Sequence, residues 1–147
     1  MQPEFRSLTP ADLDAMVVVE QAAHAHPWSR NLLADAFGER YFTGALWHKN
    51  ELLGYFIADR VLDESTLMNI CVSPAWQGRG LGRRLLEHYF TQCRALGLSL
   101  LWLEVRASNR AALALYASAG YQESGRRRNY YPALNGAEDA VLMQMAL

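Results

Sequence analysis

Val72-Ser73-Pro74-Ala75-Trp76-Gln77-Gly78-Arg79-Gly80-Leu81-Gly82 is the stretch that decides the fold of this chain. An apolar run over residues 67–72 predicts a strand before it, and the apolar spacing of residues 81–95 predicts a helix after it. Glycines let the backbone take positive φ and approach a ligand, and the free N–H groups of a helix's first turn attract negative charge. The stretch therefore predicts an anion-binding turn, and a diphosphate is the ligand that we expect.

The spacing of the glycines excludes two common phosphate-binding turns. A P-loop requires Gly-Lys-Ser or Gly-Lys-Thr, which this chain lacks, and the dinucleotide fingerprint requires Gly-x-Gly-x-x-Gly in an early strand-helix-strand unit. Here the pattern is Gly78-x-Gly80-x-Gly82, in the middle of the chain. A glycine-rich turn with only a structural role remains the alternative.

Length and composition indicate one globular domain over residues 1–147. Apolar residues make up 51% of the chain and the formal net charge is −1, so the overall charge does not favour nucleic-acid binding. The charged residues among the first twenty and the absence of a long apolar run predict a cytosolic protein without a signal peptide or membrane span, which we expect to be a monomer. Cys71 and Cys93 lack metal-ligand spacing and are interpreted as reduced packing residues.

The order of apolar and turn-forming residues predicts an α/β chain, with a mixed central sheet of about six or seven strands flanked by about four helices. Helices are expected from Pro10, with Thr9 and Asp12 as caps, from Ser29 to about Phe37, over 81–95, and from Ser108 or Asn109 to Ala119. Strands are expected over 41–47, 52–62, 67–72 and 99–105, near 121–122 and over 140–145, with turns at 63–65 and 135–136. The strands on either side of the glycine turn and its helix should lie parallel.

Glu104 is a carboxylate that directly follows four apolar residues of a central strand. Ligands of open α/β sheets gather at the carboxyl ends of parallel strands, which places Glu104 near the ligand of the glycine turn. The alternative is that Glu104 only pairs with Arg106 or another arginine.

Two motifs together resemble the GNAT acetyltransferases. Gln77-x-x-Gly80-x-Gly82 is similar to that family's coenzyme A pyrophosphate loop, and the run from Asn109 to Tyr121 is similar to its second signature, Asn-x-x-Ala-x-x-Leu-Tyr-x-x-x-Gly-Phe/Tyr. The resemblance implies the GNAT fold and acetyl-CoA as co-substrate, with Tyr116 facing the departing sulfur. Taken alone, Tyr116 would be interpreted as a core residue. The residues implied in coenzyme binding are Ile70, Cys71, Val72, Gln77, Gly78, Arg79, Gly80, Leu81, Gly82 and Asn109, with charge added by Arg79, Arg83 or Arg84.

Four segments resemble one branch of this family, which acetylates the N-terminal alanine of a small-subunit ribosomal protein. They are residues 62–70, 101–109 and 127–132 and the loop His26-Pro27-Trp28-Ser29. We expect Trp28, Tyr130 and Tyr131, with the turn at 63–64, to line a groove for the acceptor peptide. A solvated turn over residues 126–131 is the alternative. His24 and His26 are expected to be loop residues and not metal ligands.

The expected reaction is direct attack of an amine on the acetyl thioester, without a metal. Glu104 would take a proton from the amine, directly or through a water, and the phenol of Tyr116 would protonate the leaving thiolate. By analogy with the family, the backbone N–H of Val72 or of a neighbouring residue would stabilise the thioester oxygen. The coenzyme motifs do not encode the acceptor, so a small amine or a lysine side chain remains possible, as does a non-catalytic acyl-CoA sensor.

Overall fold

A computed structural model describes residues 2–147 and shows a seven-stranded mixed sheet with the order β1-β2-β3-β4-β5-β7-β6. The strands are β1 (Glu4–Arg6), β2 (Tyr41–His48), β3 (Glu51–Asp59), β4 (Glu64–Val72), β5 (Leu100–Arg106), β6 (Gln122–Ala133) and β7 (Gly136–Ala146). The helices are α1 (Leu13–Ala23), α2 (Arg30–Ala34), α3 (Leu81–Ala95) and α4 (Arg110–Ala119), with short 3-10 turns η1 (Pro10–Asp12), η2 (Asp35–Phe37) and η3 (Pro74–Trp76). The predicted fold class is confirmed.

The predicted helix ends are confirmed by their capping contacts. The Thr9 N–H donates to Asp12 Oδ2 at 2.8 Å before α1, and Ser29 Oγ accepts from the Leu32 N–H at 3.2 Å in α2. Gly97 and Gly120 end α3 and α4 with φ of 75° and 118°. These local signals place the helices where the sequence predicts them.

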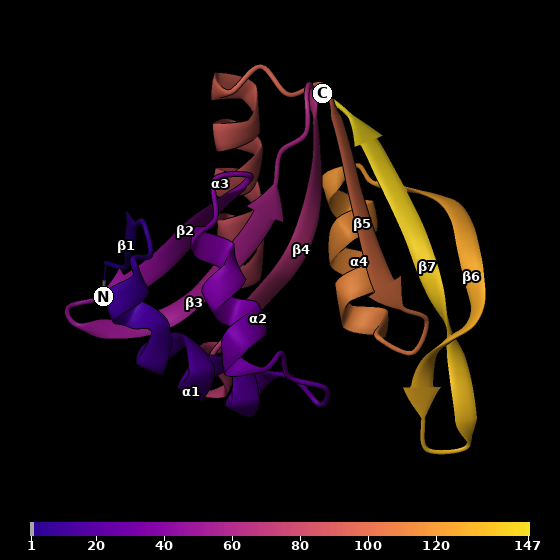
Figure 1. The fold of residues 1–147 in the computed structure, drawn as a ribbon, viewed down its shortest axis with the longest axis horizontal. Coiled ribbons are helices and arrows are strands. Elements are labelled where there is room, and N and C mark those ends of the chain that lie inside the picture. The colour runs from indigo at the N-terminus through magenta and orange to yellow at the C-terminus, as the bar shows by residue number, and fades with distance from the viewer. Residues whose placement is uncertain (1) are drawn as a thin grey trace.

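The helices cover the sheet in two layers. In Figure 1, α1 and α2 lie in front of β2, β3 and β4, and α3 and α4 lie behind the sheet. The front core contains Met16, Leu33 and Tyr55, which are fully buried, and the rear core contains Phe56 and Leu101. Among residues 2–147 no helix is both long and apolar enough to cross a membrane.

β4 and β5 pair in parallel, as predicted, but only over their first halves. Glu64 to Leu67 face Leu100 to Leu103, and the pairing stops there. At the same point β4 carries a bulge, because Ala58 pairs with Leu67 while the neighbouring Ile57 pairs with Asn69, which leaves Met68 extra. Beyond the bulge the two strands diverge toward their carboxyl ends (Figure 1).

Several predicted boundaries are wrong at the ends of strands. β3 ends at Asp59 and not at Leu62, and β4 already begins at Glu64 after a tight turn in which Leu62 has φ of 56°. β1 was not predicted. β5 alternates between buried and half-buried residues, so only one of its faces is covered. The side chain of Glu104 belongs to the uncovered face.

The segment over 126–131 is not a solvated turn but part of the long strand β6. Four residues of β6 correspond to two of β7 here, because Arg127 pairs with Ala140 and Tyr131 pairs with Glu138. Asn129 lies in this bulge with φ of 51°. The bulge shortens the spacing between Arg127 and Tyr131 and lets both side chains reach the same carboxylate.

Candidate active site

A cavity of about 780 Å³ opens where β4 and β5 diverge. Its walls come from α1 and β4 on one side and from β5 and β6 on the other. The glycine turn and α4 close one end of it. Glu104 and Tyr116 both line it, so the structure brings the two candidate catalytic side chains into one space.

The glycine turn has the geometry of an anion site. Gly78 and Gly80 both have φ of 77°, and a Cβ added at either would meet nothing within 4 Å, so these glycines serve the backbone conformation and leave room for a ligand. The first backbone bond inside α3 runs from the Arg84 N–H to the Gly80 carbonyl at 3.1 Å. The N–H groups of Leu81, Gly82 and Arg83 come before it and have no partner within the helix.

The edge of β4 next to the turn also offers a backbone donor. The Ser73 N–H donates to the Leu53 carbonyl of β3 at 2.7 Å. Successive residues of a strand direct their N–H groups to opposite edges, so the Val72 N–H faces the gap toward β5. Gln77 Nε2 donates to the Val72 carbonyl at 2.9 Å and holds the turn against the end of β4.

Most of the predicted coenzyme-binding residues line the cavity. They are Ile70, Cys71, Val72, Gln77, Gly78, Gly80, Leu81, Gly82 and Asn109. Arg79 is not in the cavity wall: its guanidinium lies over the Trp76 ring, 4.7 Å from the centroid. Arg83 contacts the Ser118 hydroxyl and pairs with Glu87 at 3.7 Å.

Asn109, the N-cap of α4, and Tyr116 lie on the same face of that helix. Asn109 Oδ1 accepts the Ala112 N–H at 3.2 Å and caps the helix, which leaves the amide Nδ2 to a ligand. Tyr116 is buried among Phe90, Tyr121 and their neighbours, and this burial raises the pKa of its phenol. The side chain is therefore a neutral hydrogen-bond donor at physiological pH.

Glu104 has two neighbours from the bulged strand β6. Its Oε1 lies 2.9 Å from Arg127 Nε in an ion pair, and Tyr131 is near enough for the charge of Glu104 to act on its phenol. Burial, followed by the charge of Glu104, raises the pKa of Tyr131. Glu104 thus pairs with an arginine and also lines the cavity. Arg106 pairs instead with Glu138 at 3.3 Å and lies over the Tyr131 ring at 4.4 Å.

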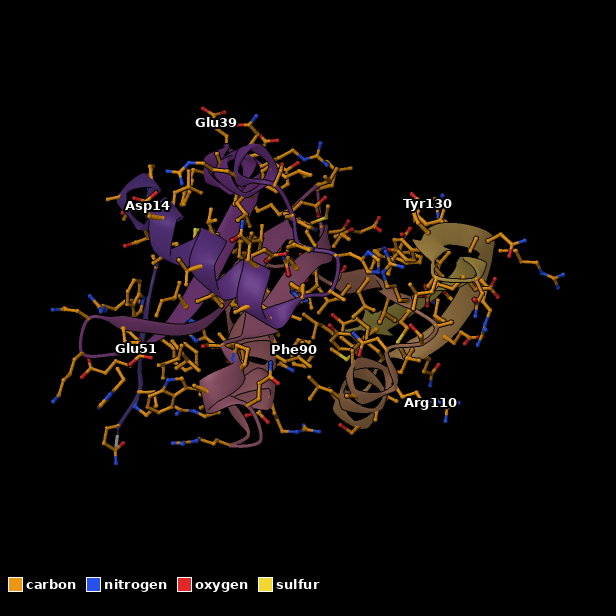
Figure 2. The ribbon with its side chains drawn as sticks, turned by 90° about the horizontal axis from the view of Figure 1, so that it is seen from below. Asp14, Glu39, Glu51, Phe90, Arg110 and Tyr130 are labelled. Carbon is orange, nitrogen blue, oxygen red and sulfur yellow. The ribbon has the colours of Figure 1, made fainter. Side chains whose placement is uncertain are left out.

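The predicted acceptor residues are only partly brought together. Trp28 and Tyr131 line the cavity. The Tyr130 ring is 52% exposed and lies on the rim of the β6–β7 hairpin, outside the cavity wall (Figure 2), so its role stays a prediction. The expected place of the turn at 63–64 is wrong: Asp63 contacts Ser99 at the start of β5, at the opposite end of the strands from the cavity.

Sequence analysis missed a polar cluster on the α1 side of the cavity. Glu20 is fully buried, and around it lie His24, Tyr55, Asn69 and Cys71. Atoms of Glu20, His24 and Cys71 come within 4.8 Å of one another, although no ligand was expected near His24. Burial raises the pKa of the Cys71 thiol, and the Glu20 oxygens already accept hydrogen bonds, so the cluster is a hydrogen-bonded network. Its only signal in the sequence is that Glu20 continues the apolar stripe of α1.

Residues 6–121 match the model of the acetyltransferase (GNAT) family, and the chain belongs to that family. It is an acyltransferase. Two of its relatives are named [ribosomal protein bS18]-alanine N-acetyltransferase. The Escherichia coli K12 enzyme (RimI) is 48% identical over 141 residues, which are 96% of this chain and 95% of that one. The Haemophilus influenzae enzyme is 43% identical over 133 residues, 90% of each chain.

Solved structures agree with this assignment. The crystal structure of the Escherichia coli ribosomal-protein-S18-alanine N-acetyltransferase superposes with a TM-score of 0.95 at 47% identity, covering 99% of this chain and 94% of that chain. A Thermoplasma acidophilum N-acetyltransferase, PaiA, solved with coenzyme A, has a TM-score of 0.82 at 14% identity over all of both chains and shares the fold. The resemblance that the motifs indicated is confirmed, and so is the GNAT fold.

The raised pKa of Tyr116 predicts how stability responds to alkali. In the unfolded chain a tyrosine titrates near pH 10, whereas the buried Tyr116 holds its proton to higher pH. Its contribution is fully present below about pH 10 and is lost above it, because the unfolded chain then binds fewer protons than the folded one. Between about pH 9 and 11 the free energy of unfolding should fall less in Tyr116→Phe than in the wild type, as measured by urea denaturation. The other tyrosines are common to both proteins, so an equal fall in the two would contradict the assignment.

Proposed function

We propose that this protein transfers the acetyl group of acetyl-CoA to the α-amine of the N-terminal alanine of a small-subunit ribosomal protein. The observation that carries the proposal is that Glu104 and Tyr116 line one cavity directly beside the glycine turn. Identity of 48% along almost the whole chain to the Escherichia coli [ribosomal protein bS18]-alanine N-acetyltransferase supports this choice of acceptor.

The donor end fits the diphosphate of acetyl-CoA. The unpaired N–H groups at the start of α3 and the open space over Gly78 and Gly80 suit a diphosphate, since anions bind at helix N-termini. Asn109 Nδ2 is available to the amide groups of the pantetheine arm. The thioester then lies against the end of β4, where the Val72 N–H faces the gap and stabilises the oxygen that becomes negative during attack.

The acceptor must attack as a neutral amine. At pH 7 roughly a tenth to a fifth of an α-amine is neutral, against well under a thousandth of a lysine ε-amine. An N-terminal substrate therefore needs only modest help from a base. Glu104 supplies it from the uncovered face of β5, and Arg127 and Tyr131 fix the direction of its carboxylate. Arg127 is half exposed and is able to move aside when the amine binds.

Collapse of the tetrahedral intermediate breaks the carbon–sulfur bond and leaves a thiolate. Tyr116 is held as a neutral phenol by burial and gives its proton to this sulfur. The proton taken up at Glu104 passes to solvent through the open side of the cavity. The Tyr116 phenolate takes a proton back from solvent when the products leave, and both residues then have their starting states.

The first prediction of this proposal concerns the acceptor itself. A peptide with the ribosomal type of N-terminal sequence beginning with alanine should gain one acetyl group when incubated with the protein and acetyl-CoA. A copy whose N-terminus is blocked and whose lysines are free should gain none, because its amines are almost fully charged at pH 7. Mass spectrometry of both peptides measures this. If neither gains mass while acetyl-CoA still binds, the acceptor is a different amine or the protein is an acyl-CoA sensor.

The roles of the two catalytic side chains predict a loss of kcat. Glu104→Gln and Tyr116→Phe should each lower kcat by roughly 10² to 10⁴ with little change in the KM for acetyl-CoA, since each removes one proton transfer. The Glu104→Gln defect should be smaller at about pH 9, where most of the α-amine is already neutral. Steady-state kinetics at two pH values test this. A defect in Glu104→Gln that is equal at both would argue against a role as base.

Adjacent tyrosines provide a matched test of the acceptor wall. Tyr131→Ala should raise the KM for the peptide by about ten-fold, because it removes a cavity-lining ring and a partner of Glu104. Tyr130→Ala should have a smaller effect, since its ring lies on the rim. The KM for acetyl-CoA should stay unchanged in both. Equal effects on the two substrates would contradict a peptide-binding role.

A further inference from the structure

The polar cluster around Glu20 is organised by one buried carboxylate. Oε1 accepts from the Tyr55 hydroxyl at 2.6 Å and from Asn69 Nδ2 at 2.9 Å, while Oε2 accepts from the Trp28 N–H at 2.9 Å. Glu20 therefore links β3, β4 and the loop after α1, and all three groups that donate to it are neutral. A fully buried carboxylate is retained only where such donors replace water.

The orientation of Asn69 fixes the proton positions on His24. Because the Asn69 amide directs its NH₂ group to Glu20, its carbonyl Oδ1 faces His24 Nε2 at 3.0 Å. A carbonyl oxygen only accepts, so Nε2 must carry the hydrogen and donate it. In neutral His24 the other ring nitrogen, Nδ1, is then left with a free lone pair. The chain of hydrogen bonds from Glu20 through Asn69 thus selects one tautomer.

His24 has the position of a ligand-binding side chain. It caps the C-terminal end of α1, lines the cavity and keeps about a third of its side chain exposed. It belongs to the wall formed by α1 and β4, and Glu104 belongs to the wall formed by β5 and β6. Within residues 2–147 no hydrogen bond occupies Nδ1. His24 and Glu104 therefore each offer a hydrogen-bond acceptor, from two different walls of the cavity.

We infer that His24 is an acceptor-binding residue whose Nδ1 accepts a hydrogen bond from the α-amino group of the substrate. This inference rests on the proposed function. An α-ammonium group has three N–H donors, and Glu104 and His24 supply two acceptors for them from different walls. When Glu104 takes the proton that faces it, the nitrogen lone pair is exposed while the bond to His24 holds the amine in place. Glu20 and Asn69 are positioning residues, since they act through the tautomer of His24.

The kinetic test compares one histidine in the cavity wall with one outside it. In His24→Gln the side-chain amide can still donate to Asn69 as Nε2 does, but no acceptor remains at the position of Nδ1. The KM for the alanine peptide should therefore rise by roughly ten-fold or more. The KM for acetyl-CoA should not change. His88→Gln is the matched control, because His88 lies on α3 outside the cavity wall and its ring stacks on Phe5. It should change the peptide KM less than about two-fold.

Asn69 tests the positioning step. Asn69→Leu should raise the KM for the peptide in the wild-type background and add nothing in the His24→Gln background, because both changes remove the same acceptor. Nitrogen NMR of the His24 ring should show the Nε2-protonated tautomer in the wild type and a mixture in Asn69→Leu. Thermal melting of each variant shows whether it is folded. Because His24 is only partly buried, His24→Gln should stay folded. The kinetic test therefore remains available even if Asn69→Leu is unstable.

The outcomes separate this inference from the function on which it rests. If the wild type does not acetylate the peptide, the proposed function fails and the inference fails with it. If the wild type is active and His24→Gln has a normal peptide KM, only the inference fails. An Nδ1-protonated ring in the wild type, or equal rises in both KM values, would also overturn it.

Discussion

The divergence of β4 from β5 beyond Leu67 and Leu103 is the constraint on which the site depends. Two parallel strands that stayed paired to their ends would leave no room between them and no free backbone donor at Val72. The bulge at Met68 ends the pairing and also turns Asn69 toward α1, where it meets Glu20. A single extra residue therefore opens the cavity and supplies one of its polar walls.

The two carboxylates of the cavity differ in their surroundings, and this difference suits different tasks. Glu104 is partly exposed, faces a cation and has room for a substrate. Glu20 is sealed from water, and neutral donors hold it from three elements of the fold. A group that must exchange protons needs access to solvent, whereas a group that fixes its neighbours needs saturated contacts. Burial alone would have pointed to Glu20, and not to Glu104, as the proposed base.

Sequence reasoning succeeded where the signal is local and failed where it depends on distant partners. The glycine turn, the helix over 81–95 and the parallel strands around it follow from spacing and capping within about forty residues. Only the start of strand β6, near residue 122, was predicted, because Gly125, Asn129 and Pro132 interrupt the strand like a turn and only pairing with β7 holds it extended. Glu20 was missed because Tyr55 and Asn69 lie 35 and 49 residues further along the chain. No window of sequence contains that contact.

The family match ends at residue 121, just before β6 begins. The residues that we propose hold the acetyl donor lie within the matched part, while Arg127 and Tyr131 come from the hairpin after it. The proposed donor site thus belongs to the matched part, whereas the proposed acceptor wall combines His24 and Trp28 of that part with the terminal hairpin. β7 is paired on both edges, with β5 and β6, whereas β6 is the outer strand of the sheet. The sequence of β6 is therefore the part of the hairpin that is freer to vary. Changes in the choice of acceptor therefore have a place to accumulate without disturbing the machinery that activates the acetyl group.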